Sequence, residues 1–119
     1  MKTENKIVEL SYAFSLQIIN LYKLLVQKKE YIISRQLLKC ATSIGANIEE
    51  AVAGQTRKDF ITKMAIASKE ARETRYWLRL LLKSQLIELD YLPYLLSVEH
   101  IINILTKIVK TSQTIPLRG

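Results

Sequence analysis

The sequence predicts an all-α protein that folds as an antiparallel up-and-down four-helix bundle. Apolar residues recur every three or four positions over four long segments, and only three glycines and two prolines occur among the 119 residues. Short polar connections separate the segments, which makes neighbouring helices antiparallel. With 49% hydrophobic and 24% charged residues, the composition is that of a globular protein, and we expect residues 1–119 to form one domain.

The first helix is expected over residues 5–27. Its apolar residues form two adjacent stripes, and one stripe is enough to face a bundle core. The first stripe contains Ile7, Leu10, Phe14, Ile18, Leu21 and Leu25, and the second contains Val8, Tyr12, Ile19, Tyr22 and Val26. The second stripe indicates either a subunit interface or a helix that is deeply buried.

The second helix is expected over residues 34–53, with Ser34 as its N-cap. Gly45 lies in its middle among other small residues and costs about 1 kcal/mol relative to alanine, so we expect a neighbouring helix to approach closely there. Gly54 stands where a left-handed residue would end the helix.

The third helix is expected over residues 57–84. Thr56 precedes it, and Asp59 follows three residues later in the manner of a capping box. A helix of this length extends for roughly 40 Å at 1.5 Å per residue.

The fourth helix is expected over residues 92–110. Asp90 is a candidate N-cap, and Pro93 falls in the first turn, where proline is tolerated. Residues 111–119 are expected to form a frayed tail.

The balance of charge points to an anionic partner. The net charge is +7 and the isoelectric point is about 9.6, which favours nucleic acid, although a basic surface can also simply be solvated. A single cysteine, Cys40, excludes an internal disulfide. We find no signal peptide and no uncharged stretch of roughly 20 residues to span a membrane, and we expect a cytoplasmic protein.

The residues give no support to an enzyme. His100 is the only histidine, so neither a di-iron bundle site nor a structural zinc site can be assembled. Cys40 lies among small apolar residues and is interpreted as a buried, inert thiol. There is no glycine-rich phosphate loop. We therefore expect no catalytic residue, no metal and no cofactor.

Basic residues follow one face of the expected third helix, with a tyrosine among them. Such a stripe could neutralise phosphates and offer a ring for stacking, and a phosphate could also bind at the helix start. The candidate nucleic-acid-binding residues are Arg57, Lys58, Lys69, Arg72, Tyr76, Arg79 and Lys83. The alternative is a solvated face that binds no nucleic acid.

Polar residues on the second and third helices form a second candidate group, namely Asn47, Glu50, Glu70 and Glu73. Buried carboxylates must be paired or hydrogen-bonded, and Arg72 or Arg75 could serve. The group is either a polar network between helices or subunits, or a solvated face held by pairs within one helix.

The segment from Gln36 to Ala51 resembles the signature of the 23S rRNA intervening-sequence proteins, a family of four-helix bundles. The matching residues are Gln36, Leu37, Ser43, Ile44, Asn47, Ile48 and Glu50. The resemblance extends from about Leu24 to Leu86. The sequence departs from the family pattern at Ala51, where many members have glycine, and at Lys69 and Glu70.

The resemblance implies a function that the residues alone do not establish. Such proteins are similar to the accessory subunit of diversity-generating retroelements, and this similarity implies a homo-oligomer, a pentamer, that binds nucleic acid and a reverse transcriptase. We therefore expect a non-enzymatic homo-oligomeric bundle that binds RNA or DNA with little sequence selectivity. The alternative is a structural or adaptor bundle that binds an acidic protein and no nucleic acid.

Overall fold

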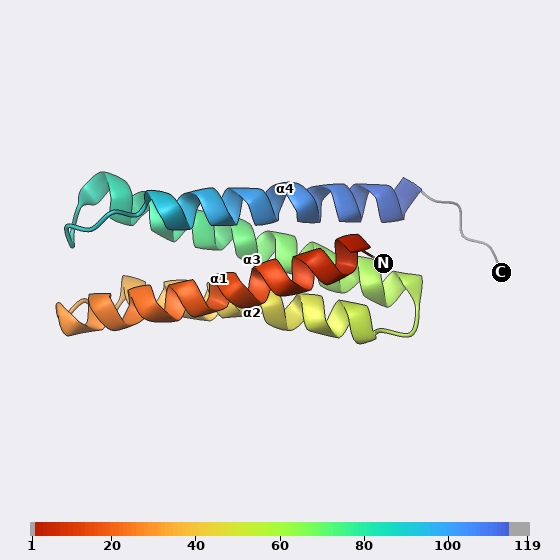
Figure 1. The fold of residues 1–119 in the computed structure, drawn as a ribbon, viewed down its shortest axis with the longest axis horizontal. Coiled ribbons are helices and arrows are strands. Elements are labelled where there is room, and N and C mark those ends of the chain that lie inside the picture. The colour runs from red at the N-terminus through yellow and green to blue at the C-terminus, as the bar shows by residue number, and fades with distance from the viewer. Residues whose placement is uncertain (1, 115–119) are drawn as a thin grey trace.

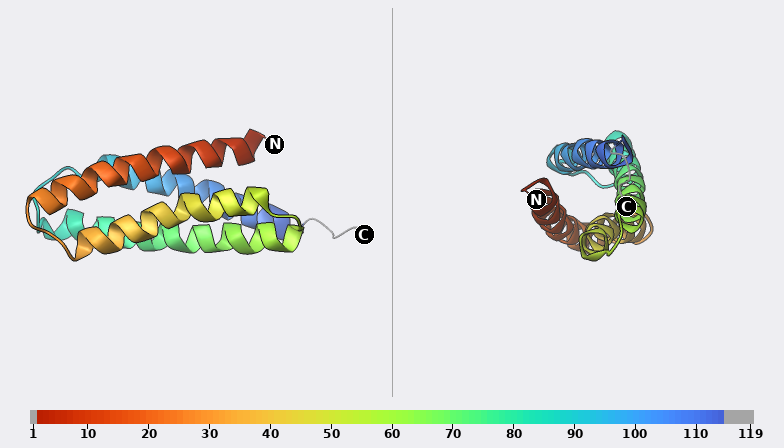
Figure 2. Two further views of the ribbon diagram at one scale, coloured as in Figure 1. Left: turned by 90° about the horizontal axis from the view of Figure 1, so that it is seen from below. Right: turned by 90° about the vertical axis from the view of Figure 1, so that its right-hand side faces the viewer.

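Four long helices form an antiparallel bundle, as predicted. The structure, a computed structural model, describes the backbone of residues 2–114 and the side chains of residues 4–114. The helices are α1 (Lys2–Gln27), α2 (Ile33–Ala53), α3 (Arg57–Ser84) and α4 (Leu92–Thr114). Each runs along the long axis of a body that measures 54 × 22 × 21 Å (Figure 1). Viewed end-on, they follow one another around a common axis (Figure 2).

The order of packing follows the order of the chain. α2 packs most extensively on α3, and the α1–α2 and α3–α4 pairs come next. α1 and α4 close the ring through the most sparsely packed of the four contacts. α3 therefore sits between two well-packed neighbours, which fixes one of its sides toward α2 and the other toward α4.

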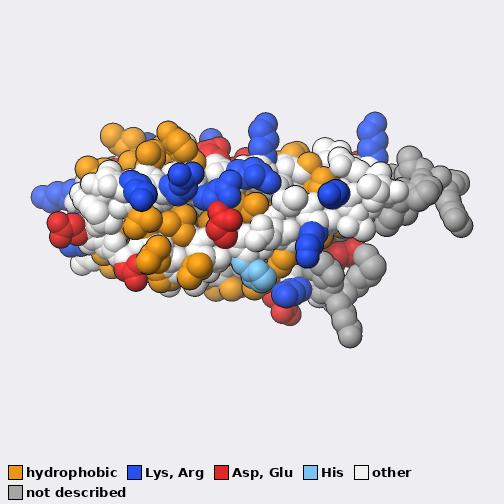
Figure 3. All heavy atoms as spheres, turned by 90° about the horizontal axis from the view of Figure 1, so that it is seen from above, with side chains coloured by type: hydrophobic (Ala, Val, Ile, Leu, Met, Phe, Trp, Pro, Cys, Tyr) orange, Lys and Arg blue, Asp and Glu red, His pale blue; other side chains and the backbone are white. Residues whose placement is uncertain are grey.

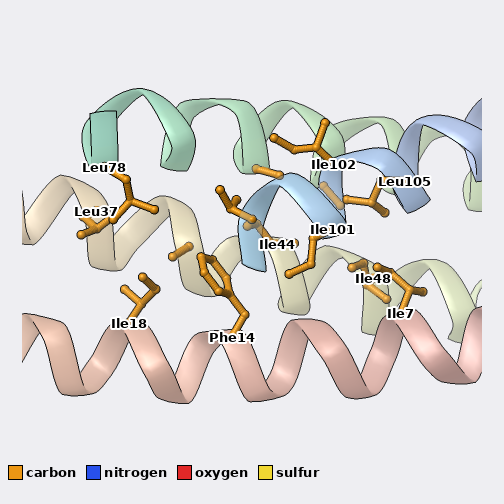
Figure 4. Close-up of a cluster of buried hydrophobic side chains, with 14 of the residues drawn as sticks. Ile7, Phe14, Ile18, Leu37, Ile44, Ile48, Leu78, Ile101, Ile102 and Leu105 are labelled. Atoms are coloured by element: carbon orange, nitrogen blue, oxygen red, sulfur yellow. The ribbon is translucent and has the colours of Figure 1, made fainter. Parts of the chain in front are cut away.

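The core is a continuous apolar column along the axis of the bundle. Phe14 of α1 points toward Ile44 of α2 and Ile101 of α4, Ile18 lies further along α1 on the side of Leu37 of α2, and all five side chains are buried (Figure 4). Most of the first apolar stripe of α1 is fully buried, as its helical spacing predicts. Burial of side chains of this size contributes roughly 1.5–3 kcal/mol each relative to exposure, which makes this column the main source of stability.

The start of α2 differs from the prediction. Ser34 is not the N-cap, because the helix begins at Ile33 and Ser34 is buried within its first turn. The carboxylate of Glu30 takes the capping role instead. It accepts hydrogen bonds from the backbone N–H groups of Ile32 (3.1 Å), Ile33 (3.1 Å) and Ser34 (2.6 Å). A carboxylate satisfies these otherwise unpaired donors and complements the positive end of the helix dipole.

Both glycines assigned a role in α2 behave differently from the prediction. Gly54 ends the helix in an extended conformation (φ −65°, ψ 151°), so the predicted left-handed cap is wrong. At Gly45 a Cβ atom would lie 3.5 Å from Ser11 Oγ and 3.6 Å from Ser15 Oγ, which is ordinary van der Waals contact. The approach of α1 therefore leaves room for alanine, and close packing does not require the glycine.

The ends of α3 follow the sequence closely. The Thr56 hydroxyl accepts a hydrogen bond from the Asp59 backbone N–H at 3.0 Å, which confirms the predicted N-cap. At the other end, Gln85 adopts the left-handed conformation (φ 47°), and its N–H bonds to the Leu81 carbonyl.

α4 starts as predicted and ends later. The Asp90 carboxylate accepts from the Leu92 N–H at 3.1 Å, and Pro93 lies in the first turn. The helix continues to Thr114 rather than ending at residue 110, so residues 111–114 do not form a frayed tail; residues 115–119 lie outside the described part. The physical reason is that residues 111–114 contain neither glycine nor proline, so no helix-breaking residue ends α4 at residue 110. α1 likewise starts at Lys2 rather than residue 5, with Glu4 in its first turn.

α4 is also long enough, and its mean hydropathy high enough, to cross a membrane. The sequence analysis did not predict this property. In this fold the apolar residues of α4 form part of the bundle core. Val98, Ile101 and Leu105 are fully buried against the other helices, as expected for the core helix of a bundle.

Candidate nucleic-acid interface

The predicted basic residues of α3 gather on its solvent-facing side. Lys69, Arg72, Arg79 and Lys83 are all exposed, and Tyr76 is exposed over 55% of its surface. We call these five residues the basic stripe. It covers the 15 residues from Lys69 to Lys83, which are roughly 21 Å apart along the helix axis. Figure 3 shows lysine and arginine side chains in a row along the side of the molecule that α4 occupies.

Two hydrogen-bonded contacts attach the basic side of α3 to α4. Arg75 Nη1 lies 2.7 Å from Glu99 Oε1, and Arg72 Nη2 donates to Thr106 Oγ1 at 3.2 Å. The sequence had suggested that these arginines pair with Glu70 or Glu73, but their partners in the structure are Glu99 and Thr106 of α4. Glu99 is the only acidic residue of α4, and Arg75 neutralises it.

Two lysines of α4 join the basic stripe, and the sequence reading did not include them. Lys107 and Lys110 are exposed near the C-terminal end of α4. Because α3 and α4 are antiparallel and Arg72 contacts Thr106, the following turn of α4 lies beside the residues that precede Arg72. An explicit alignment of the two antiparallel helices could have revealed this juxtaposition. We call the basic stripe together with Lys107 and Lys110 the α3–α4 face.

The carboxylates of α3 lie on its other side, toward α2. Lys63 bridges to Glu50 of α2 at 2.8 Å, and Glu70 and Glu73 both lie close enough to Cys40 of α2 to raise the pKa of its thiol. Partial burial and the neighbouring Glu73 charge raise the pKa of Glu70. The two arginines Arg72 and Arg75 therefore lie toward α4, whereas Glu70 and Glu73 lie toward α2, together with Lys63.

The four predicted polar residues share the α2–α3 contact but do not form one network. Asn47 Nδ2 donates to the Ser43 carbonyl of its own helix at 2.8 Å. Glu50 pairs with Lys63, and Glu73 accepts from Trp77 Nε1 at 3.2 Å. Asn47, Glu50 and Glu73 therefore each have a local partner, within one turn of the same helix or across the α2–α3 contact.

Tyr76 is held beside a second aromatic residue. Its ring centroid lies 5.1 Å from that of Trp77, with an edge-to-face angle of 73°. Trp77 is partly buried and hydrogen-bonded to Glu73, so it limits the movement of the more exposed Tyr76 ring. An exposed and partly fixed aromatic ring between cations is suited to stacking on a base.

The remaining two predicted residues lie apart from the stripe. Lys58 is exposed near the start of α3, eleven residues or about 16 Å from Lys69 along the helix. Arg57 is half-buried and already engaged in an interaction. The structure therefore groups five of the seven candidates and separates the two at the helix start.

Cys40 is buried, as predicted. The Thr74 hydroxyl lies 3.1 Å from its sulfur, and burial raises the pKa of the thiol from 9.0 to about 11. Such a thiol is protonated and unreactive at neutral pH. Among the residues that the structure describes, no three His, Cys, Asp or Glu side chains are grouped to hold a metal ion.

The second apolar stripe of α1 is only partly covered. Tyr12 is exposed over 65% of its surface, while Val8, Ile19, Tyr22 and Val26 are half-buried. The helix is therefore not deeply buried on two sides within one chain.

Comparison with known proteins identifies relatives of the whole bundle. The model of the family described as 23S rRNA-intervening sequence protein matches residues 3–107. A crystal structure of a protein with unknown function from the S23 ribosomal protein family of Bacteroides thetaiotaomicron superposes with a TM-score of 0.86. It is 44% identical in sequence, and the match covers 91% of this chain and 98% of that one. Among curated proteins, none matches at a significant level.

Proposed function

Because the chain belongs to the 23S rRNA-intervening sequence protein family, we propose that it is a non-enzymatic, homo-oligomeric bundle that binds RNA or DNA through the α3–α4 face. Binding has little sequence selectivity, since contacts to phosphates position a protein without reading bases. We expect this activity in the cytoplasm.

The observation that carries the proposal is the gathering of cations on the α3–α4 face. Four exposed cations of the basic stripe and two of α4 share one face, and the single carboxylate of α4, Glu99, is already paired with Arg75. Each phosphate that such a face neutralises releases counterions, which drives binding at low salt. Tyr76 adds a stacking surface of the kind that single strands use.

The partly covered stripe of α1 supports self-association. A second copy packed on Tyr12 and its half-buried neighbours would remove apolar surface from water. The resemblance to the retroelement accessory subunit makes a pentamer the expected assembly. Light scattering should return the mass of an oligomer, and a monomeric mass would reject this part of the proposal.

A charge-matched pair of variants tests the binding face. Lys69, Arg79 and Lys83 would be changed to alanine together, and the control would change exposed cations on the other half of the bundle, Lys6, Lys23 and Arg35. Both variants lose three charges. Affinity for a fluorescent single-stranded RNA is then measured across salt concentrations.

The expected results differ between the two variants. Removing three phosphate contacts should lower the salt slope by about 2, since each contributes about 0.7 on a single strand, whereas the control should keep the slope of the unmodified protein. Equal losses in both variants would show that net charge alone drives binding. Absence of binding by the unmodified protein at low salt would favour the adaptor function, with an acidic protein as partner.

A further inference from the structure

A hollow of about 280 Å³ lies between α3 and α4 beside Arg72. Its apolar lining comes from Ala65 and Val109. The two helices contribute to it at regular helical spacing, with Ala65, Ser68 and Arg72 on one side. The hollow is therefore formed by the register of the two antiparallel helices and is not an accident of one long side chain.

Every polar residue that lines the hollow carries a hydrogen-bond donor. α3 supplies the Ser68 hydroxyl and the Arg72 guanidinium, and α4 supplies Thr106, Lys110 and Gln113. Two of the five are cations, and none of the described residues that line the hollow carries a carboxylate. Such a donor set suits a compact anion with several acceptor oxygens.

Arg72 is fixed in place at the edge of the hollow. One of its terminal nitrogens, Nη2, donates to Thr106 Oγ1 at 3.2 Å, while the residue as a whole is exposed. A guanidinium has five N–H donors, so this bond leaves others to pair with two oxygens of one ligand. Lys110 faces it from α4 as a mobile point charge.

We propose that this hollow binds one phosphodiester group of a nucleic-acid backbone, held between Arg72 and Lys110 with Ser68 and Thr106 as hydroxyl partners. The inference rests on the proposed function and adds a defined subsite to it. Apart from Arg72, the cations of the basic stripe are exposed on α3 and do not line the hollow, whereas the hollow lies between two helices. It therefore sets where one phosphate of the strand sits, and the stripe binds the neighbouring phosphates more loosely.

Two substitutions test the subsite without altering the basic stripe. Lys110→Gln removes one cation of the hollow, and Lys23→Gln removes one exposed cation of α1 as its matched control. The Lys110 variant should lower the salt slope for single-stranded RNA by about 0.7, and the Lys23 variant should leave it unchanged. Thr106→Val removes the hydroxyl that fixes Arg72 without changing charge, and should weaken binding about threefold to tenfold, the effect of one hydrogen bond.

A second measurement keeps this inference separate from the proposed function. Inorganic phosphate is titrated into the ¹⁵N-labelled protein, and the amide resonances of Ser68, Thr106 and Lys110 are followed. Saturable shifts at these residues that disappear in Lys110→Gln support the hollow, whether phosphate is offered free or in a strand. If RNA binds but Lys110→Gln and Thr106→Val behave as Lys23→Gln does, the subsite is refuted and the binding face survives. If phosphate shifts the hollow but no nucleic acid binds, the phosphodiester assignment and the proposed function both fail.

Discussion

Replacement of Glu30 by alanine should destabilise the bundle by about 2–4 kcal/mol. Its buried carboxylate accepts three backbone N–H bonds at the start of α2, including that of the buried Ser34 at 2.6 Å. Loss of an N-cap costs about 1–2 kcal/mol, and an N–H left buried without a partner adds about 1–3 kcal/mol. The two contributions add to about 2–5 kcal/mol, and we take the lower part of this range because water can enter the turn and satisfy part of the deficit.

Urea denaturation followed by circular dichroism at 222 nm measures this loss, at a fixed protein concentration because self-association adds to apparent stability. Glu30→Gln is the matched variant, since it keeps one acceptor oxygen and the shape of the side chain, and it should lose about half as much. A change below about 0.5 kcal/mol in Glu30→Ala would refute the capping role and restore Ser34 as the candidate.

Three further predictions follow from single residues. Gly45→Ala should stabilise the bundle by about 1 kcal/mol in the same assay, because a Cβ there makes only ordinary contact with Ser11; destabilisation would mean that α1 lies closer than described. Burial raises the pKa of the Cys40 thiol from 9.0 to about 11, so folding favours the protonated thiol. The resulting contribution to stability is complete below about pH 9 and is lost as pH rises toward about 11. Between these pH values the Cys40→Ala variant should therefore lose less stability than the unmodified protein. Equal pH profiles for the two proteins would contradict this. Glu99→Gln should free Arg75 from its ion pair and raise the affinity for RNA at low salt. The loss of stability should be less than about 1 kcal/mol. Weaker binding of RNA would count against the α3–α4 face.

The fold was predictable because the apolar residues recur at the spacing of an α-helix. Ile7, Phe14 and Ile18 are spaced to face one side of a helix, and all three are buried. The helix limits that depend on local chemistry were also largely predictable, as the caps at Thr56 and Asp90 show. Both caps precede a helix by the usual one or two positions.

The capping of α2 was not predictable by the same rule. Ser34 has the preferred side chain for an N-cap, but the helix begins one residue before it, and Glu30 accepts from the first N–H groups of the helix from an upstream position. The path of the turn decides between them, and propensity does not encode that path. Gly54 illustrates the same limit, since glycine permits the left-handed conformation but does not require it.

Only the part of the candidate interface that lies on α3 could be predicted from the sequence. Residues at helical spacing on α3 could be assigned to one face, but Lys110 lies beside Arg72 only because α4 is antiparallel to α3 in one particular register. That register depends on side-chain packing along the whole helix pair. A single-helix pattern therefore finds the stripe and misses the hollow.

The opposite flanks of α3 also affect how the molecule meets a polyanion at a distance. With Arg72 and Arg75 toward α4 and Glu70 and Glu73 toward α2, α3 contributes a transverse electric dipole in addition to the positive net charge of the protein. In the field of a nucleic acid this dipole exerts a torque that turns the cationic flank forward before any contact forms. More encounters then begin in a productive orientation, so neutralising Lys63 or Glu70 on the far flank would alter the association rate more than the lifetime of the complex.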